Sequence, residues 1–365
     1  MTCRERLIRV FKRQEVDRMP IRLWGVDPLT PRDDWATLYC LIEKYDLEMI
    51  RTWSPGPDEW PVSPIVKKTE KGPVKDGQQE VKNIWETPKG PLVEVFCSFV
   101  DGSPGRHVKY LIETPEDAEK YLSLPEYLAL PKVNSYWALE KKSGEQAMLM
   151  VGIDQAMYSI QRLMGSETFG YWLYDHRELL HLMIRRSFRY LKRLVRHYLE
   201  NNLGDAYGWV GPELCIPPLA SVTDFYDFVV RYDREIASLI HEFGKLVWVH
   251  CHGDMSEVLK GFIELGVDCL NPIEPPPVGR ITLAEAKEIC SGRMALEGNV
   301  EDGAFDCLKP EQMKALVAET INQGKPGGGF ILCPTSSPTT WPKLPAHVET
   351  NYRVFVETAV TMRDY

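Results

Sequence analysis

The sequence predicts an α/β protein: a single (β/α)8 TIM barrel over residues 1–365, with an inserted β-hairpin and helical region between its second and third strands. Short apolar runs alternate with longer amphipathic stretches, and eight such β-α units can be counted. A length of 365 residues, of which 44% are hydrophobic, suits such a barrel. A doubly wound open sheet is the alternative, but its phosphate-binding glycine fingerprint is missing after the first strand.

The first two β-α units precede the inserted region. Leu7, Val10 and Phe11 have helical spacing, and the first strand candidate breaks at Gly25. The predicted elements are a helix over 2–12, a strand over 21–24, a helix over 33–45 and a strand over 47–53.

Residues 54–146 interrupt this alternation. Prolines open the stretch, and the runs 80–85 and 92–99 predict a β-hairpin around the turn at 87–90. Thr114 followed by proline and acidic residues is typical of a helix start. We expect this insertion to cover one end of the barrel.

The alternation resumes at residue 147 and becomes regular. Predicted strands cover 147–151, 205–210, 246–250, 267–271, 293–297 and 329–333. Predicted helices cover 154–164, 176–201, 222–243, 255–265, 282–290, 310–323 and 346–361.

Composition and charge narrow the class of protein. The formal net charge of -9, with Lys and Arg dispersed among acids, disfavours a nucleic-acid partner. No apolar run approaches the roughly 20 residues of a membrane span, and residues 1–13 lack the apolar core of a signal peptide. Nine scattered cysteines indicate free thiols in a reducing compartment. We therefore expect a cytoplasmic protein without a membrane partner; its oligomeric state, a homo-oligomer included, is left open.

Three potential metal ligands end two of the predicted strands. His250 and His252 close the fifth strand on one face, with Cys251 on the other, and Cys333 closes the eighth. Two imidazoles and one thiolate can bind zinc and leave its fourth position open, as catalytic zinc requires. A hydrogen-bonded core histidine and a packed cysteine are the plain alternatives.

Aromatic and acidic residues gather at the same predicted strand ends, where a barrel carries its chemistry. The aromatic residues could line a pocket for a planar or methylated substrate, or simply fill the core. The carboxylates could donate a proton, orient a zinc histidine or complete the metal site. We assign candidate catalytic roles to Glu213 and Asp154, and candidate substrate-binding roles to Trp24, Asp27, Trp53, Tyr158, Tyr207, Trp209 and Glu274.

Motifs along nearly the whole chain match one known superfamily. They are Asp17-Arg18-Met19-Pro20, Gly204-Asp205, Val249-His250-Cys251-His252-Gly253, Glu264-Leu265-Gly266-Val267-Asp268, Leu296-Glu297-Gly298-Asn299-Val300, Cys333-Pro334 and Pro345-Ala346-His347-Val348. The chain thereby resembles the uroporphyrinogen decarboxylase superfamily, most strongly after residue 200. That superfamily contains metal-free porphyrinogen decarboxylases and zinc-dependent methyltransferases that work with corrinoid proteins.

The resemblance favours the methyltransferase branch. The decarboxylases are expected to carry Arg-Gln-Ala-Gly-Arg after the first strand, where this chain has Trp24-Gly25-Val26-Asp27-Pro28. The methyltransferases carry His-x-Cys-Gly on strand five and a cysteine after strand eight, and His250, His252 and Cys333 match those places. His252 is a departure, because the thiol-methylating members have cysteine there.

An imidazole in place of a thiolate makes a zinc site more Lewis-acidic and better suited to an ether oxygen. The resemblance therefore implies an O-demethylase component that takes a methyl group from a methoxylated, aromatic compound to the cob(I)amide of a partner corrinoid protein. The alternatives are methyl transfer from methylcobamide to a thiol such as coenzyme M or to a folate, a decarboxylase, and a non-catalytic binding protein.

Overall fold

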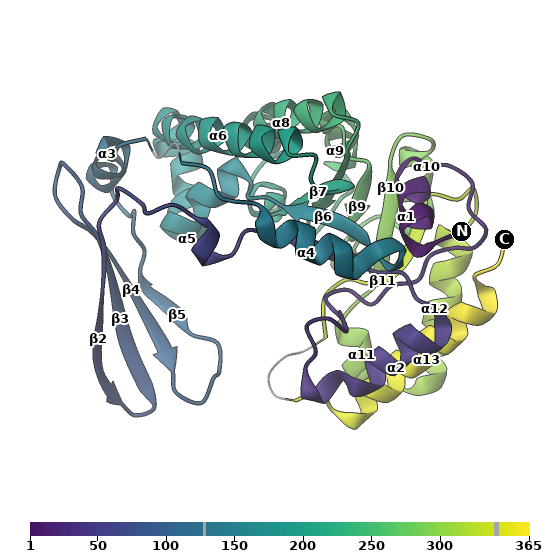
Figure 1. The fold of residues 1–365 in the computed structure, drawn as a ribbon. Coiled ribbons are helices and arrows are strands. Elements are labelled where there is room, and N and C mark those ends of the chain that lie inside the picture. Colours follow the sequence, from purple (N-terminus) through teal and green to yellow (C-terminus); the bar gives the residue numbers. More distant parts are fainter. Residues whose placement is uncertain (127–128, 339–342) are drawn as a thin grey trace. The chain divides into compact units, whose positions relative to one another are not determined.

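A computed structural model describes residues 1–126, 129–338 and 343–365 of the chain (Figure 1). Residue contacts divide the chain into two compact units. The first unit contains Met1–Ser54, Asn134–Ile153 and Tyr198–Tyr365, and the second contains Pro55–Val133 and Asp154–His197.

The first unit is built on a curled parallel sheet of seven strands in the order β1-β6-β7-β8-β9-β10-β11. Strand neighbours in the sheet are successive strands of this unit, as right-handed β-α connections produce. The α/β prediction is confirmed, and the sheet is TIM-like. Its strands are β1 (Ile50–Trp53), β6 (Met148–Gly152), β7 (Ala206–Val210), β8 (Leu246–His250), β9 (Cys269–Asn271), β10 (Ala295–Val300) and β11 (Phe330–Pro334).

The predicted first strand, 21–24, is reduced to an isolated parallel bridge between Ile21 and Leu332 of β11. The Leu332 amide donates to the Pro20 carbonyl, and the Glu48 amide donates to the Ile21 carbonyl, each at 3.0 Å. This short segment therefore hydrogen-bonds both to β11 and to the residues that lead into β1.

Helices of the first unit follow the predicted pattern, with shifted ends. Helix α9 begins at Leu259, four residues later than predicted, and it ends where Gly266 adopts a φ of 98°, which favours glycine. The helices are α1 (Cys3–Phe11), α2 (Ala36–Tyr45), α4 (Asn134–Ser143), α7 (Val222–Asp224), which continues through a π-helical segment (Phe225–Val230) into α8 (Arg231–Glu242), α9 (Leu259–Leu265), α10 (Leu283–Cys290), α11 (Gly303–Cys307), α12 (Pro310–Gly324) and α13 (Ala346–Met362).

Alternate residues of the parallel strands form a core with helix α1. Met148, Ala206, Leu246, Cys269, Ala295 and Ile331 pack with Leu7, Val10 and Phe11 of α1. Because side chains alternate along a strand, the residues two and four positions further on share the same inner face. This alternation determines which side chains lie on the inner face of the sheet at the C-terminal ends of its strands.

The second unit contains a four-stranded antiparallel sheet of β2 (Lys67–Lys75), β3 (Gln78–Trp85), β4 (Leu92–Phe99) and β5 (Arg106–Lys109). Strands β3 and β4 pair where the sequence predicts a hairpin. The unit also holds α3 (Pro115–Ser123), α5 (Ala156–Asp175) and most of α6 (Arg177–Glu200). It therefore includes helices that the sequence places in the barrel, and the covering role of 54–146 stays a prediction.

Among the helices of the described residues, none combines the length and the apolar character that crossing a membrane demands.

Candidate active site

Four residues with polar side chains lie on the inner face of neighbouring parallel strands. His250 continues the inward parity of Leu246 and Trp248, and Asn271, Glu297 and Cys333 continue that of Cys269, Ala295 and Ile331. The register places His250 beside Asn271. All four are buried, so their hydrogen bonds must come from the protein.

His250 is held in one tautomer by Asn271. The Asn271 amide Nδ2 donates to the Glu297 backbone carbonyl at 3.3 Å, so its Oδ1 lies 2.7 Å from His250 Nδ1. That Oδ1 can only accept, and Nδ1 therefore carries the proton. Burial, with a smaller contribution from His252, lowers the pKa of His250 to about 3. Neutral His250 thus keeps a lone pair on Nε2, as a metal ligand or proton acceptor needs.

His252 is oriented in the same manner by a carboxylate. Its Nδ1 lies 2.7 Å from Glu274 Oε1, and this hydrogen bond raises the pKa of His252, although burial opposes it. The ring centroids of His250 and His252 are 4.5 Å apart, with the rings perpendicular. Gly253 follows with a φ of 97°, which permits the chain to turn immediately after the ring. A carboxylate on Nδ1 that frees Nε2 is the usual second partner of a zinc histidine.

Glu297 is a carboxylate with no exposure to solvent. Its Oε2 accepts a 2.7 Å hydrogen bond from Trp248 Nε1, and its Oε1 forms an ion pair with Arg22. Arg22 is itself only 4% exposed. The two buried charges compensate each other, as burial requires.

Cys333 lies beside this ion pair with no exposed surface. Burial, and then the Glu297 carboxylate, raises the pKa of the Cys333 thiol well above its usual value, while Arg22 opposes the shift. The thiol is therefore protonated. Among the residues that the structure describes, no three His, Cys, Asp or Glu side chains are grouped closely enough to hold a metal ion. The two histidines fit zinc by their free Nε2 atoms, whereas the thiol of Cys333 is not gathered with them.

Two further carboxylates act on His252. Burial raises the pKa of Glu213, and His252 partly offsets that rise. The Gly211 amide donates to Glu213 Oε2 at 3.1 Å and fixes the side chain. Burial likewise raises the pKa of Asp302, which His252 opposes. Glu213 and Asp302 are thus acids that retain a proton to higher pH than usual beside an imidazole.

Trp24 borders His250 from the segment after the Ile21 bridge. Its ring centroid lies 4.3 Å from that of His250 and 6.1 Å from that of Trp248. Gly25 has a φ of 72°, and a Cβ there would lie 2.7 Å from Ser337 Cβ, so the loop after Cys333 closes on this glycine. The Asp27 carboxylate forms an ion pair with Arg51, and its Oδ2 lies 3.1 Å from Arg51 Nε.

Three predicted pocket aromatics point to the other face of the sheet. Trp53 Nε1 donates to Ser135 Oγ at 2.8 Å, and its ring packs edge-on against Tyr136 and Tyr198. The Tyr207 hydroxyl donates to the Leu203 carbonyl at 3.2 Å, and Trp209 is 3% exposed. The odd parity of residues 207 and 209 places them under the helices, since Ala206 faces inward.

Asp154 and Tyr158 belong to the second unit. Asp154 and Arg162 form a half-exposed ion pair, in which Asp154 Oδ2 lies 2.9 Å from Arg162 Nη2. The Arg162 guanidinium also lies 5.0 Å from the centroid of the Tyr158 ring. The contacts of both residues described here lie within that second unit.

Sequence reasoning assigned no role to Arg22, Trp248, Asn271 or Glu297. A signal existed for Glu297, because an acid inside the apolar run 294–300 must be buried and therefore paired. Asn271 ends a strand and lies two residues after Cys269, so its side chain faces the same inner side of the sheet. The partners themselves, Arg22 above all, come from distant segments that no local pattern connects.

Comparisons with known proteins identify a family for this chain and a solved structure with the same fold. A methyltransferase from Methanosarcina mazei has the same fold, with a TM-score of 0.61, 16% identity and 98% of each chain covered. A B12-independent methionine synthase from a Shewanella species gives a TM-score of 0.42 at 11% identity over 78% of this chain and 75% of that chain. The search of curated proteins found no match. Residues 97–358, more than half of the sequence, match the family described as uroporphyrinogen decarboxylase (URO-D), and the chain belongs to that family.

Proposed function

We propose that this protein is a zinc-dependent methyltransferase that moves a methyl group from a methoxylated aromatic compound to the Co(I) corrinoid of a partner protein. The observation that carries the proposal is the histidine pair. Each Nδ1 is held by an oxygen acceptor, Asn271 for His250 and Glu274 for His252, so each Nε2 is left for a ligand. Family membership and the fold shared with a methyltransferase support it.

Zinc in this proposal is held by His250, His252 and Cys333. The nitrogen and sulfur donors are those that zinc prefers, and three protein ligands leave a position for substrate. Cys333 would have to turn from Glu297 and release its proton, and thiol deprotonation is a normal part of zinc binding. The ion, when bound, supplies Lewis acidity to the ether oxygen.

The chain's own residues bind the substrate and manage the proton. Trp24 presents a half-buried ring beside His250, against which an aromatic ring can stack. In the transfer the bond between methyl carbon and oxygen breaks, and the oxygen keeps the electron pair and takes up a proton. The Co(I) corrinoid supplies the pair for the new bond. Glu213 is the proposed proton donor because burial raises its pKa, so it retains its proton to a higher pH than an exposed carboxyl does.

Asp154 is the less suitable of the two predicted acids. Its carboxylate is half-exposed to solvent and already pairs with Arg162. The choice of an ether over a thiol donor rests on His252, because a neutral imidazole gives a harder site than a thiolate would.

A metal analysis combined with a turnover assay tests the proposal. The wild type, purified without a histidine tag, should contain zinc, and Cys333→Ala should lose it. Cys290→Ala, which removes another buried thiol on helix α10, should keep the metal. With zinc and a reduced corrinoid protein, methoxyaromatics should methylate cobalt, whereas methanol, methylamines and methylthiols should not. Wild type without zinc, or undiminished zinc in Cys333→Ala, would refute the metal site.

A further inference from the structure

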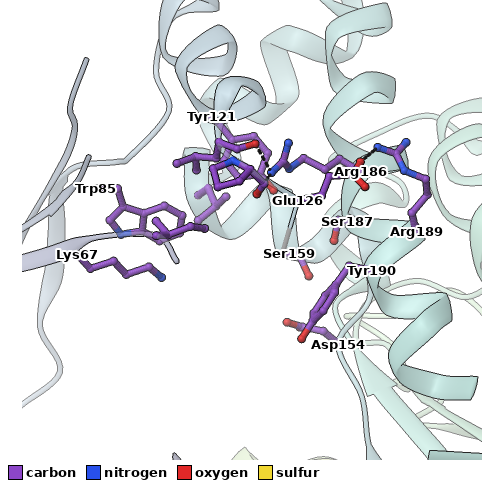
Figure 2. A pocket seen from close by; sticks show the side chains of 14 residues that line it. Lys67, Trp85, Tyr121, Glu126, Asp154, Ser159, Arg186, Ser187, Arg189 and Tyr190 are labelled. Carbon is purple, nitrogen blue, oxygen red and sulfur yellow. Dashed lines mark hydrogen bonds and ion pairs between the residues drawn. The ribbon is translucent and has the colours of Figure 1, made fainter. Parts of the chain in front are cut away.

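The second unit contains a cavity of about 420 Å³ that the proposed methyl transfer does not use (Figure 2). Figure 2 shows Lys67 and Trp85 at one side of the view, and Arg186 and Arg189 at the other. The volume lies in the range of small-molecule sites. We call it the Lys67–Arg186 cavity.

Both carboxylates that line this cavity are already neutralised by arginines. Glu126 forms an ion pair with Arg189, and Asp154 forms one with Arg162 at 2.9 Å. Neither acid forms an ion pair with Lys67 or Arg186, although the charge of Arg186 also acts on Glu126.

Lys67 is the first uncompensated cation. Its Nζ lies 3.7 Å from the centroid of the Trp85 ring, a cation–π contact. Within the described ranges, its ammonium group has no ion pair and no hydrogen-bond acceptor. Loss of water there lowers the pKa of Lys67, and Glu94 opposes this only through its charge. An anion in the cavity would supply the missing partner.

Arg186 is the second uncompensated cation. Its guanidinium donates to the carbonyls of Leu122, Leu124 and Pro125 at 2.8 to 3.2 Å, and lies 5.5 Å from the Tyr121 ring centroid. Carbonyl acceptors leave its positive charge in place, and no carboxylate pairs with it in the part of the chain that the structure describes. Arg186 is therefore both fixed in position and still cationic.

The rest of the lining is suited to a flat apolar body. The rings of Trp85 and Tyr121 and the side chains of Ile65, Leu124 and Leu163 supply apolar surface. Two separated cations and this surface together fit a molecule with one anionic and one planar part.

We propose that the Lys67–Arg186 cavity binds a small aromatic carboxylate, with the carboxylate at Lys67 and the ring against the aromatic side chains of the lining. This site is independent of the proposed methyl transfer and requires neither zinc nor a corrinoid.

Titration calorimetry on the full-length protein tests the assignment, with benzoate as the probe. Benzoate should bind, and benzamide, which has the same ring without the charge, should bind at least about tenfold more weakly. Lys67→Gln should weaken benzoate binding roughly tenfold, because it removes one charge from an exposed strand. Lys71→Gln, also exposed on β2 but outside the cavity, should leave it unchanged.

Trp85→Leu provides a second variant that keeps both cations. It should weaken benzoate binding while leaving the weaker binding of cyclohexanecarboxylate nearly unchanged, because only benzoate can stack. Absence of benzoate binding at millimolar concentrations, equal affinity for benzamide, or equal losses in Lys67→Gln and Lys71→Gln would each overturn the proposal.

Discussion

Trp248 Nε1 donates a 2.7 Å hydrogen bond to Glu297 Oε2, on the inner face of the parallel sheet. The other carboxylate oxygen faces Arg22, so both oxygens of Glu297 are engaged where no solvent reaches. Cys333 lies within the field of the same carboxylate. The buried charges of Arg22 and Glu297 therefore balance each other within a single ion pair.

Glu297→Gln should destabilise the fold by about 3–5 kcal/mol, because it leaves the buried Arg22 charge without a partner. Urea unfolding followed by circular dichroism measures this. The double variant Arg22→Met with Glu297→Gln should recover part of the loss, since no charge then remains to be buried. A single-variant loss below about 1 kcal/mol would show that the pair is not isolated from water.

Glu274→Gln should weaken zinc binding about 10- to 100-fold, because a neutral amide orients His252 without making its imidazole more basic. Competition with a chromophoric chelator measures the affinity. Glu288→Gln, an exposed change on helix α10, is the matched control and should bind zinc as the wild type does. Equal affinities in all three proteins would exclude a role for Glu274 in the metal site.

Glu213 should impose an alkaline limit on the rate. A general acid acts only while protonated, so activity should fall as the pH rises through the pKa of Glu213, which burial raises above its usual value. Glu213→Gln should remove that limb and slow turnover by about 10²- to 10⁴-fold. Asp154→Asn should keep both the fall of activity at high pH and the wild-type turnover rate. The reverse pattern would transfer the role to Asp154.

Gly25→Ala should destabilise the protein more than a strained backbone alone does. Gly25 and Gly292 both have positive φ, 72° and 66°, but only at Gly25 would a Cβ meet another atom, 2.7 Å away on Ser337. Gly292→Ala should cost about 1 kcal/mol, and Gly25→Ala measurably more. Thermal unfolding of the two variants gives the comparison, and equal shifts would mean that Ser337 moves aside without cost.

Periodicity was sufficient to predict the elements of the parallel sheet, because each of these strands is a short apolar run between amphipathic helices. It did not predict that residues 21–24 form only a bridge, since that depends on hydrogen bonds to the distant Leu332 and Glu48. Parity along β7 would have shown that Tyr207 and Trp209 face the helices. The partners of His250 and His252 lie on and after the next strand, where the parallel register brings Asn271 beside His250.

Helix α1 packs across the N-terminal residues of the parallel strands, with Leu7, Val10 and Phe11 against their inner face. His250 lies at the opposite end of its strand from the residues that α1 covers. For the proposed reaction, we expect both the methoxylated compound and the corrinoid domain to approach from the end that carries His250. For that reaction we expect the compound to bind before the corrinoid domain covers it.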